Sequence, residues 1–216
     1  MKKVLTVLVA LMLVLSMTTA FAAVPSKTTN PTIVDITTVS GDPLPEGFTI
    51  TTVGDTTMTI EQVEKLYEFV KEGNAPIDFF EPEVQNAILA KLNENKPSTE
   101  ALTLDDLRDW EINEIVSVDA TNYDPAAGDI VVTFEFATPY QLDQRMVGIL
   151  DCYDGTRTEV EPNVFEFNSE KIVLGAEVKE SEDDKSLVDV TFTADAIVKM
   201  QESVANALSI FSEPMK

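Results

Sequence analysis

The sequence predicts an α+β protein: an N-terminal part with a few strands and two main helices, and a C-terminal antiparallel β-rich part of sandwich type with one helix near its end. Apolar residues recur at helical spacing in residues 59–73 and 82–95, as they do in helices that bury one face. Residues 130–136 place Ile, Val or Phe at every second position, the pattern of a half-buried strand. No internal repeat is visible, which excludes a solenoid or a propeller.

The N-terminal part begins with two segments rich in β-branched residues, 32–39 and 48–53, joined by a loop with strong turn chemistry. They are expected to form a hairpin or two neighbouring strands. Thr59 is expected to cap the first helix, with Gln62 completing a capping box, and Gly73 is expected to end it. The expected apolar stripe on this helix is Ile60, Val63, Tyr67 and Val70.

A second helix is expected to begin near Pro82, a good first-turn residue, and to stop at Asn95-Lys96-Pro97. A helical turn over 104–109 and a strand over 112–118 follow. Between the two helices, the residues expected to fill the core are Ile77, Phe79 and Phe80.

The C-terminal part shows strand patterns over 130–136 and 146–152, and a hairpin of 172–178 with 188–192. Cys152 belongs to the apolar face of the second of these strands. Thr193 is expected to cap an amphipathic helix over 194–204, and a last strand is expected over 207–211.

The first 22 residues predict a signal peptide for secretion. Lys2 and Lys3 precede an apolar run over 4–15, and Ala20-Phe21-Ala22 is a cleavage site of the Ala-x-Ala kind. The expected organisation is a signal peptide (1–22), a tether (23–31), an α+β part (32–118) and a β-rich part (119–216), the last two being separate domains or two lobes of one. The mature protein is expected to be extracellular or associated with the cell surface, with no membrane insertion after cleavage.

Charge and composition exclude several classes of function. With 38 acidic residues against 15 basic ones, the net charge is −23, and such a surface repels nucleic acid and anionic lipid. The chain has no histidine and one cysteine. This excludes Ser-His-Asp and Cys-His catalysis, the usual zinc sites and an intramolecular disulfide. No glycine-rich phosphate loop is present, so no cofactor is expected.

Carboxylates are the remaining catalytic groups, since a glycosidase needs only two of them. The candidates at the edges of expected elements are Asp105, Asp106, Asp109, Glu111 and Glu114. Some clustering arises by chance among so many acids, and a helix N-terminus favours negative charge at Asp105 and Asp106 without any catalytic role.

A calcium site is a second hypothesis. Asp119, Asn122, Asp124 and Asp129 lie in one expected loop between strands and could supply oxygen ligands. Their spacing matches no EF-hand, and the same residues are ordinary turn formers. Asp151 and Asp154 do not give the Asp-x-Asp-x-Asp register either.

Aromatic side chains provide a third hypothesis, a stacking platform for sugar rings. The candidates are Trp110, Tyr123, Tyr140 and Tyr153, and Trp110 is the one to test first. The alternative is that these rings cover the edges of the core.

Two passages carry a resemblance: residues 79–89 (FFEPEVQNAIL) and residues 134–140 (FEFATPY), the latter followed by a strand and an Asp154-Gly155 turn. They resemble secreted, signal-bearing proteins of unknown function from gram-positive bacteria and, more loosely, the immunoglobulin-like modules of bacterial surface proteins. The resemblance implies a surface or secreted role and transfers no site residues.

These observations predict a non-catalytic secreted or cell-surface interaction protein that binds an extracellular protein or glycan. The alternative is a carboxylate-based hydrolase that acts on extracellular polysaccharide or cell-wall material. Two buried carboxylates in one cleft would favour the hydrolase, and a shallow aromatic face would favour the binding protein.

Overall fold

The computed structural model describes residues 31–54, 56–94, 96–162, 164–182 and 184–215. The predicted signal peptide, and all of the predicted tether except Pro31, lie outside the described residues. None of the described helices has the length and apolarity needed to cross a bilayer.

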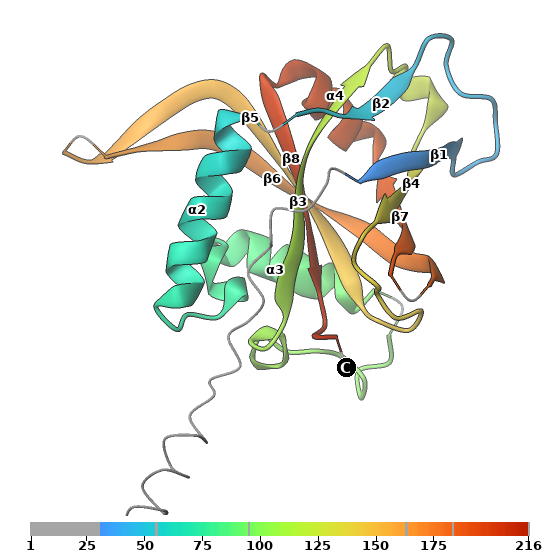
Figure 1. The fold of residues 1–216 in the computed structure, drawn as a ribbon. Coiled ribbons are helices and arrows are strands. Elements are labelled where there is room, and N and C mark those ends of the chain that lie inside the picture. Colours follow the sequence, from blue (N-terminus) through green and yellow to red (C-terminus); the bar gives the residue numbers. More distant parts are fainter. Residues whose placement is uncertain (1–30, 55, 95, 163, 183, 216) are drawn as a thin grey trace, which may run out of the picture.

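Eight antiparallel strands form one curled sheet (Figure 1). Their order across the sheet is β1-β4-β7-β6-β5-β8-β3-β2, and the edge strands β1 and β2 approach each other without forming a ladder among the described residues. The expected hairpin of 32–39 with 48–53 is therefore wrong: β1 pairs with β4 and β2 with β3. The strands are β1 (Thr32–Thr38), β2 (Thr49–Thr52), β3 (Glu111–Thr121), β4 (Ile130–Phe136), β5 (Met146–Glu161), β6 (Val164–Ser181), β7 (Ser186–Phe192) and β8 (Ala205–Ser212).

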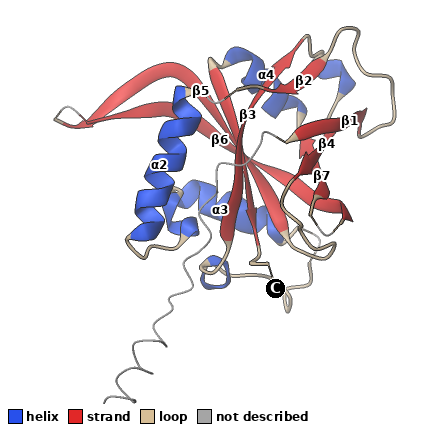
Figure 2. Cartoon of the chain, in the orientation of Figure 1, coloured by secondary structure: helices blue, strands red, loops and turns tan. Residues whose placement is uncertain are grey.

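Among the described residues, three α-helices and three short 3-10 helices pack against this sheet (Figure 2). The α-helices are α2 (Thr57–Lys71), α3 (Pro82–Leu92) and α4 (Ala194–Glu202), and the 3-10 helices are η1 (Pro76–Phe79), η2 (Asp105–Leu107) and η3 (Pro125–Ala127). The sheet is nearly closed, so it has an inner face and an outer face, and each face buries its own core.

The inner core is formed by alternate residues of the strands together with α4. Phe134, Leu150 and Leu208 are fully buried there. Gly148 allows the strands to approach closely, because a Cβ atom at this position would lie 3.2 Å from side-chain atoms of both Leu208 and Val190. A curled sheet of this kind needs such a position where inward-pointing side chains would otherwise collide.

The outer core lies between the opposite face of the central strands and the segments α2, η1, α3 and η2. Phe211 of β8 is fully buried there, with its ring centroid 5.3 Å from that of Trp110 and 6.3 Å from that of Phe80. Ile77 and Phe80 are buried as predicted, whereas Phe79 is only partly buried. Because Leu208 and Phe211 belong to the same strand, β8 joins the two cores.

This architecture contradicts the predicted combination of an N-terminal α+β part with a β-sandwich. Strands of the N-terminal part join the same sheet as the C-terminal strands: β1 pairs with β4, and β3 pairs with β8. The strand patterns themselves were correct. Alternation identifies a strand with a buried face but not its partner, so one curled sheet and two stacked sheets give the same pattern.

The start and the buried face of α2 also differ from prediction. Its N-cap is Thr56, whose side chain accepts a hydrogen bond from the Thr59 backbone N–H. The Thr59 hydroxyl instead lies 2.6 Å from that of Ser117 on the sheet. The predicted stripe is wrong at Ile60 and Tyr67, which are exposed, while Leu66 is buried. Two faces of α2 carry apolar residues at similar spacing, and contact with the sheet determines which of them is buried.

Sequence patterns gave the start of α3 at Pro82 and the Thr193 cap of α4 correctly. Helix α4 ends at Glu202, and Val204 is exposed in the connection to β8. The hairpin between β6 and β7 is also confirmed.

Strands β5 and β6 extend beyond the rest of the sheet as a two-stranded arm, residues 154–161 and 164–170 (Figure 1). The arm is mostly polar, so no strand is predicted there, and the turn predicted at Asp154-Gly155 lies within β5. The arm is held by cross-strand contacts. The Arg157 guanidinium lies 4.1 Å from the ring centroid of Phe167, and Tyr153 packs edge-on against the same ring.

Candidate functional site

A cleft lies where the arm crosses α2 and the turn between η1 and α3. Two ion pairs connect the arm to α2: Arg157 with Glu61 at 3.1 Å, and Lys65 with Glu166 at 3.7 Å. They are exposed and add little stability, but they position the arm above the helix. The cleft has a volume of about 180 Å³, and its walls are formed by Glu61, Gln62, Lys65, Phe79, Glu81, Asp151, Glu166, Phe167, Ser169 and Lys171.

Asp151 is the most enclosed charged group in this cleft, with 4% of its surface exposed. Its Oδ2 accepts a hydrogen bond from the Gln62 amide and lies 3.4 Å from the Lys171 ammonium. Its Oδ1 is buried, and no hydrogen-bond partner for it is found in the part of the chain that the structure describes. A buried polar atom without a hydrogen-bond partner lowers the stability of the fold by about 1–3 kcal/mol. The folded chain carries this cost at Asp151.

A small cavity of about 20 Å³ lies beneath the cleft, between α2 and the sheet, and Gln62, Asp151 and Lys171 line it too. This volume is enough for about one water molecule. Asp151 therefore lines both the larger cleft and the small cavity beneath it, which has room for one water molecule.

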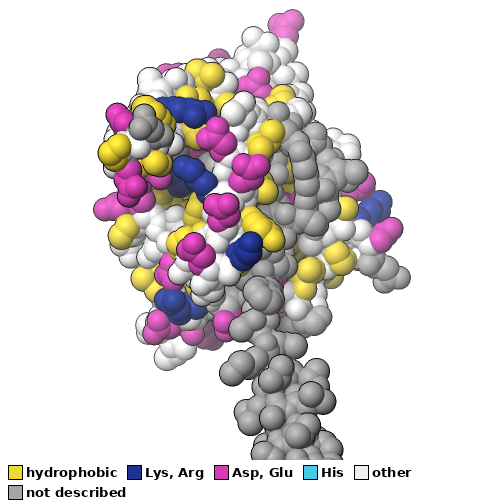
Figure 3. All heavy atoms as spheres, turned by 60° about the vertical axis from the view of Figure 1, so that its left-hand side comes forward, with side chains coloured by type: hydrophobic (Ala, Val, Ile, Leu, Met, Phe, Trp, Pro, Cys, Tyr) yellow, Lys and Arg dark blue, Asp and Glu magenta, His cyan; other side chains and the backbone are white. Residues whose placement is uncertain are grey.

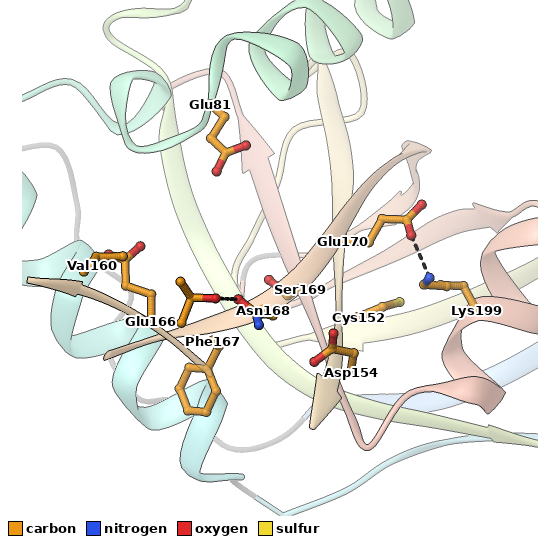
Figure 4. Close-up of a pocket in the computed structure, with 11 residues that line it drawn as sticks. Glu81, Cys152, Asp154, Val160, Glu166, Phe167, Asn168, Ser169, Glu170 and Lys199 are labelled. Carbon is orange, nitrogen blue, oxygen red and sulfur yellow. Dashed lines mark hydrogen bonds and ion pairs between the residues drawn. The ribbon is translucent and has the colours of Figure 1, made fainter. Parts of the chain in front are cut away.

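A second, larger cavity of about 360 Å³ shares Glu81, Glu166, Phe167 and Ser169 with the cleft. Figure 4 shows Glu81 above the β6 segment that carries Ser169, and the ion pair between Glu170 and Lys199 on the other side of that segment. The Glu170–Lys199 distance is 2.8 Å. The two cavities thus flank the base of the arm.

Acidic side chains dominate this part of the molecule. Four of the residues lining the cleft are acidic and two are basic. Both basic residues, Lys65 and Lys171, already lie within ion-pair distance of an acid, whereas no ion pair of Glu81 is found among the described residues. Figure 3 shows acidic side chains spread over the face that its view presents, with fewer Lys and Arg among them. An anionic ligand would therefore meet like charges.

Cys152 follows Asp151 in β5 but points to the opposite face, where it is 1% exposed. Burial raises the pKa of its thiol to about 12, and the neighbouring Asp151 carboxylate adds to the effect. Because the thiolate is the reactive form, we expect Cys152 to resist alkylating reagents at pH 8 and to react only after unfolding. Rapid native labelling, or a disulfide-linked dimer as the dominant species, would contradict this placement.

The same shift predicts how stability depends on alkaline pH. The pKa of the Cys152 thiol in the folded chain lies above the ordinary value of 9.0. The stabilisation that comes from the neutral thiol is therefore complete below pH 9 and is lost as the pH rises from 9 towards 12. Over this range the free energy of unfolding falls by about 1.4 kcal/mol per pH unit. Denaturant titrations at several pH values should show this slope in the wild-type chain and a smaller one in Cys152→Ala.

The calcium candidates have structural roles. Asp124 caps η3 by accepting a hydrogen bond from Ala126 N–H, and Asp129 accepts one from Ala194 N–H at the start of α4. The Asn122 amide donates to the Gly47 carbonyl. Asp119 accepts from the next backbone N–H and is exposed. No cluster of three or more potential metal-ligating side chains is found among the described residues.

Salt and calcium should therefore affect stability differently. At a net charge of −23 the folded chain repels itself, and 0.1 M NaCl screens charges over about 10 Å. We expect NaCl to raise the melting temperature and calcium to add little beyond it. A saturable shift at sub-millimolar calcium in 0.15 M NaCl, lost in Asp124→Ala, would instead establish a calcium site.

Trp110, the first candidate for sugar stacking, is 2% exposed and belongs to the outer core. The Arg145 guanidinium lies 5.9 Å from the centroid of its ring. An indole enclosed in this way presents no open face to a sugar. Tyr123 and Tyr140 are also buried, and Tyr153 packs against Phe167 near the base of the arm.

The candidate catalytic carboxylates do not meet in the cleft. Glu114 is the buried one among them, at 4% exposure, and accepts a hydrogen bond from the Thr138 hydroxyl. Asp106 is exposed, and its two hydrogen bonds from Thr103 hold its pKa below the usual value. Asp105 and Asp109 are exposed and Glu111 is half-buried. None of the five lines the cleft.

The residues that form the cleft were missed as a site. Asp151 carried one usable signal: an acid at an outward position within the otherwise apolar run 146–152. Lys171 directly opposes it on β6, a pairing that depends on the register of two strands and is invisible in either strand alone.

No protein-family model matches the chain, and no match is found among curated proteins or solved structures.

Proposed function

We propose that this protein is a non-catalytic extracellular binding protein, secreted or held at the cell surface, and that the cleft between α2 and the arm is its binding site. The observation that carries the proposal is Asp151, a buried carboxylate that lines the cleft and whose Oδ1 has no hydrogen-bond partner among the described residues. The rings of Phe79 and Phe167 supply apolar wall beside it. Binding sites commonly combine apolar walls with a few convergent polar groups.

Capture experiments with the mature chain test this proposal. Immobilised protein is incubated with cell-wall fragments, glycans and secreted proteins, and bound material is compared between Phe167→Ser and Phe165→Ser. Phe167 lines the cleft, while Phe165 lies nearer the tip of the arm and is 48% exposed. We expect Phe167→Ser to lose the bound component and Phe165→Ser to retain it. Equal retention by both variants would contradict the assignment of the cleft.

The alternative, a carboxylate-based hydrolase, has one observation in its favour: Asp151 and Glu81 line the same cleft. An assay for reducing ends in the same mixtures distinguishes it. New reducing ends released from polysaccharide by the wild-type chain, and lost in both Asp151→Asn and Glu81→Gln, would replace the binding proposal with the enzymatic one.

The extracellular location gives a separate prediction. Cleavage after Ala22 should leave a mature chain that starts at Ala23 or within about two residues of it. Intact-mass analysis of protein from the culture medium measures this directly. Soluble extracellular protein that retains residues 1–22 would refute the predicted signal peptide.

A further inference from the structure

The unpartnered oxygen of Asp151 defines the kind of atom that would complete the cleft. An ionised carboxylate only accepts hydrogen bonds, so Oδ1 requires an N–H or O–H donor. The donors supplied by the chain, from Gln62 and Lys171, lie at the other carboxylate oxygen, Oδ2. A ligand that binds at Oδ1 therefore brings its own donor.

Charge around the cleft favours a cationic donor over a neutral one. Lys65 is associated with Glu166, and Lys171 with Asp151, so the lining acids exceed the lining bases. Glu81 is the acid for which no ion pair is found among the described residues. Hydrogen bonds between an ammonium and a carboxylate are about twice as strong as those between neutral groups.

The shape of the cleft favours a slender ligand. Asp151 lies at its enclosed floor, whereas Glu61, Glu81 and Glu166 are more exposed. Phe79 and Phe167, which are both half-buried, also line the cleft. An alkyl chain can contact the two rings while an ammonium at its end reaches the floor, and a second ammonium would then face the outer acids.

From these three observations we propose that the cleft binds ligands with a primary ammonium group on an alkyl chain, and that Asp151 Oδ1 accepts a hydrogen bond from that ammonium. This specificity rests on the proposed function of the cleft as the binding site. A diamine is the preferred form, because Glu81 can pair with the second ammonium. Quaternary ammonium ions have no N–H donor, so they do not satisfy Asp151.

The test uses 1,4-diaminobutane and n-butylamine as probes, with tetramethylammonium, 1,4-butanediol and glucose for comparison. Calorimetric titration and thermal unfolding of the mature chain are measured in 0.15 M NaCl, which screens weak binding to the acidic surface. We expect both amines to bind saturably and to raise the melting temperature, the diamine more strongly. The quaternary ion, the diol and glucose should produce no saturable effect.

Three variants locate the binding. Asp151→Asn should weaken diamine binding by about tenfold or more, since it removes a charged partner. Glu81→Lys, a change at an exposed position, should weaken the diamine more than the monoamine. Glu46→Gln makes the same change in net charge as Asp151→Asn at an exposed site outside the cleft lining, and it should bind like the wild-type chain.

The outcomes separate this inference from the proposed function. Saturable binding of glucose or the diol, lost in Asp151→Asn, would overturn the amine specificity and leave the cleft as the binding site. No saturable binding of either amine would overturn the inference and indicate that the oxygen is satisfied by a single water in the cavity beneath. Equal weakening by Glu46→Gln and Asp151→Asn would also overturn it, because the amines would then be acting as counterions.

Discussion

Phe211→Ala is expected to lower the free energy of unfolding by about 3–5 kcal/mol. The Phe211 ring is fully buried between Trp110 and Phe80, so its removal leaves a cavity in the outer core that the surrounding rings cannot fill completely. Phe165→Ala is the matched control because Phe165 is 48% exposed, and we expect it to change stability by less than about 0.5 kcal/mol. Denaturant titration measures both values.

The same experiment tests whether the two cores unfold together. Trp110 is the single tryptophan and lies in the outer core, so its fluorescence reports that core, while circular dichroism in the far ultraviolet reports the whole sheet. Because β8 contributes to both cores, we expect the two transitions to coincide. Loss of fluorescence at lower denaturant concentration than loss of the sheet would show that the outer core is an independent unit.

Lys171→Met is expected to destabilise the fold by about 3 kcal/mol, because it leaves the Asp151 carboxylate buried without its counter-charge. The Lys171 side chain is 25% exposed, and its ammonium lies 3.4 Å from Asp151 Oδ2. Because the lysine is only partly buried, we expect a loss of stability at the lower end of the range for buried ion pairs. Denaturant titration at pH 7 gives the value.

A second substitution separates loss of charge from loss of packing. Adding Asp151→Asn to Lys171→Met removes the uncompensated charge, and we expect it to recover most of the lost stability. If the double variant is as unstable as Lys171→Met alone, the cost comes from the packing of the lysine stem. If Lys171→Met has no effect, Asp151 does not depend on this partner.

Sequence patterns predicted the parts of the fold that are determined locally. Alternation in residues 130–136 identified β4, and Pro82 and Thr193 marked the starts of two helices. These signals come from neighbouring residues along the chain. The partners of the strands are determined by packing between distant segments, so the single curled sheet was not predicted.

The arm and its cleft were not predicted for a related reason. Residues 154–161 and 164–170 are largely polar and lack the alternation of a strand with one buried face. Their strand structure depends on pairing with each other and on contacts such as Arg157 with Phe167. Asp151 becomes distinctive only when α2 covers it, which no pattern within β5 indicates.

The most direct test of amine recognition in the cleft is a titration of the isotopically labelled mature chain with 1,4-diaminobutane, followed by amide chemical shifts. We predict saturable shifts centred on Gln62, Asp151 and Lys171, which require about tenfold or more diamine in Asp151→Asn and are unchanged in Glu46→Gln. Small, non-saturating shifts spread over the acidic surface, with none centred on these three residues, would contradict amine recognition in the cleft.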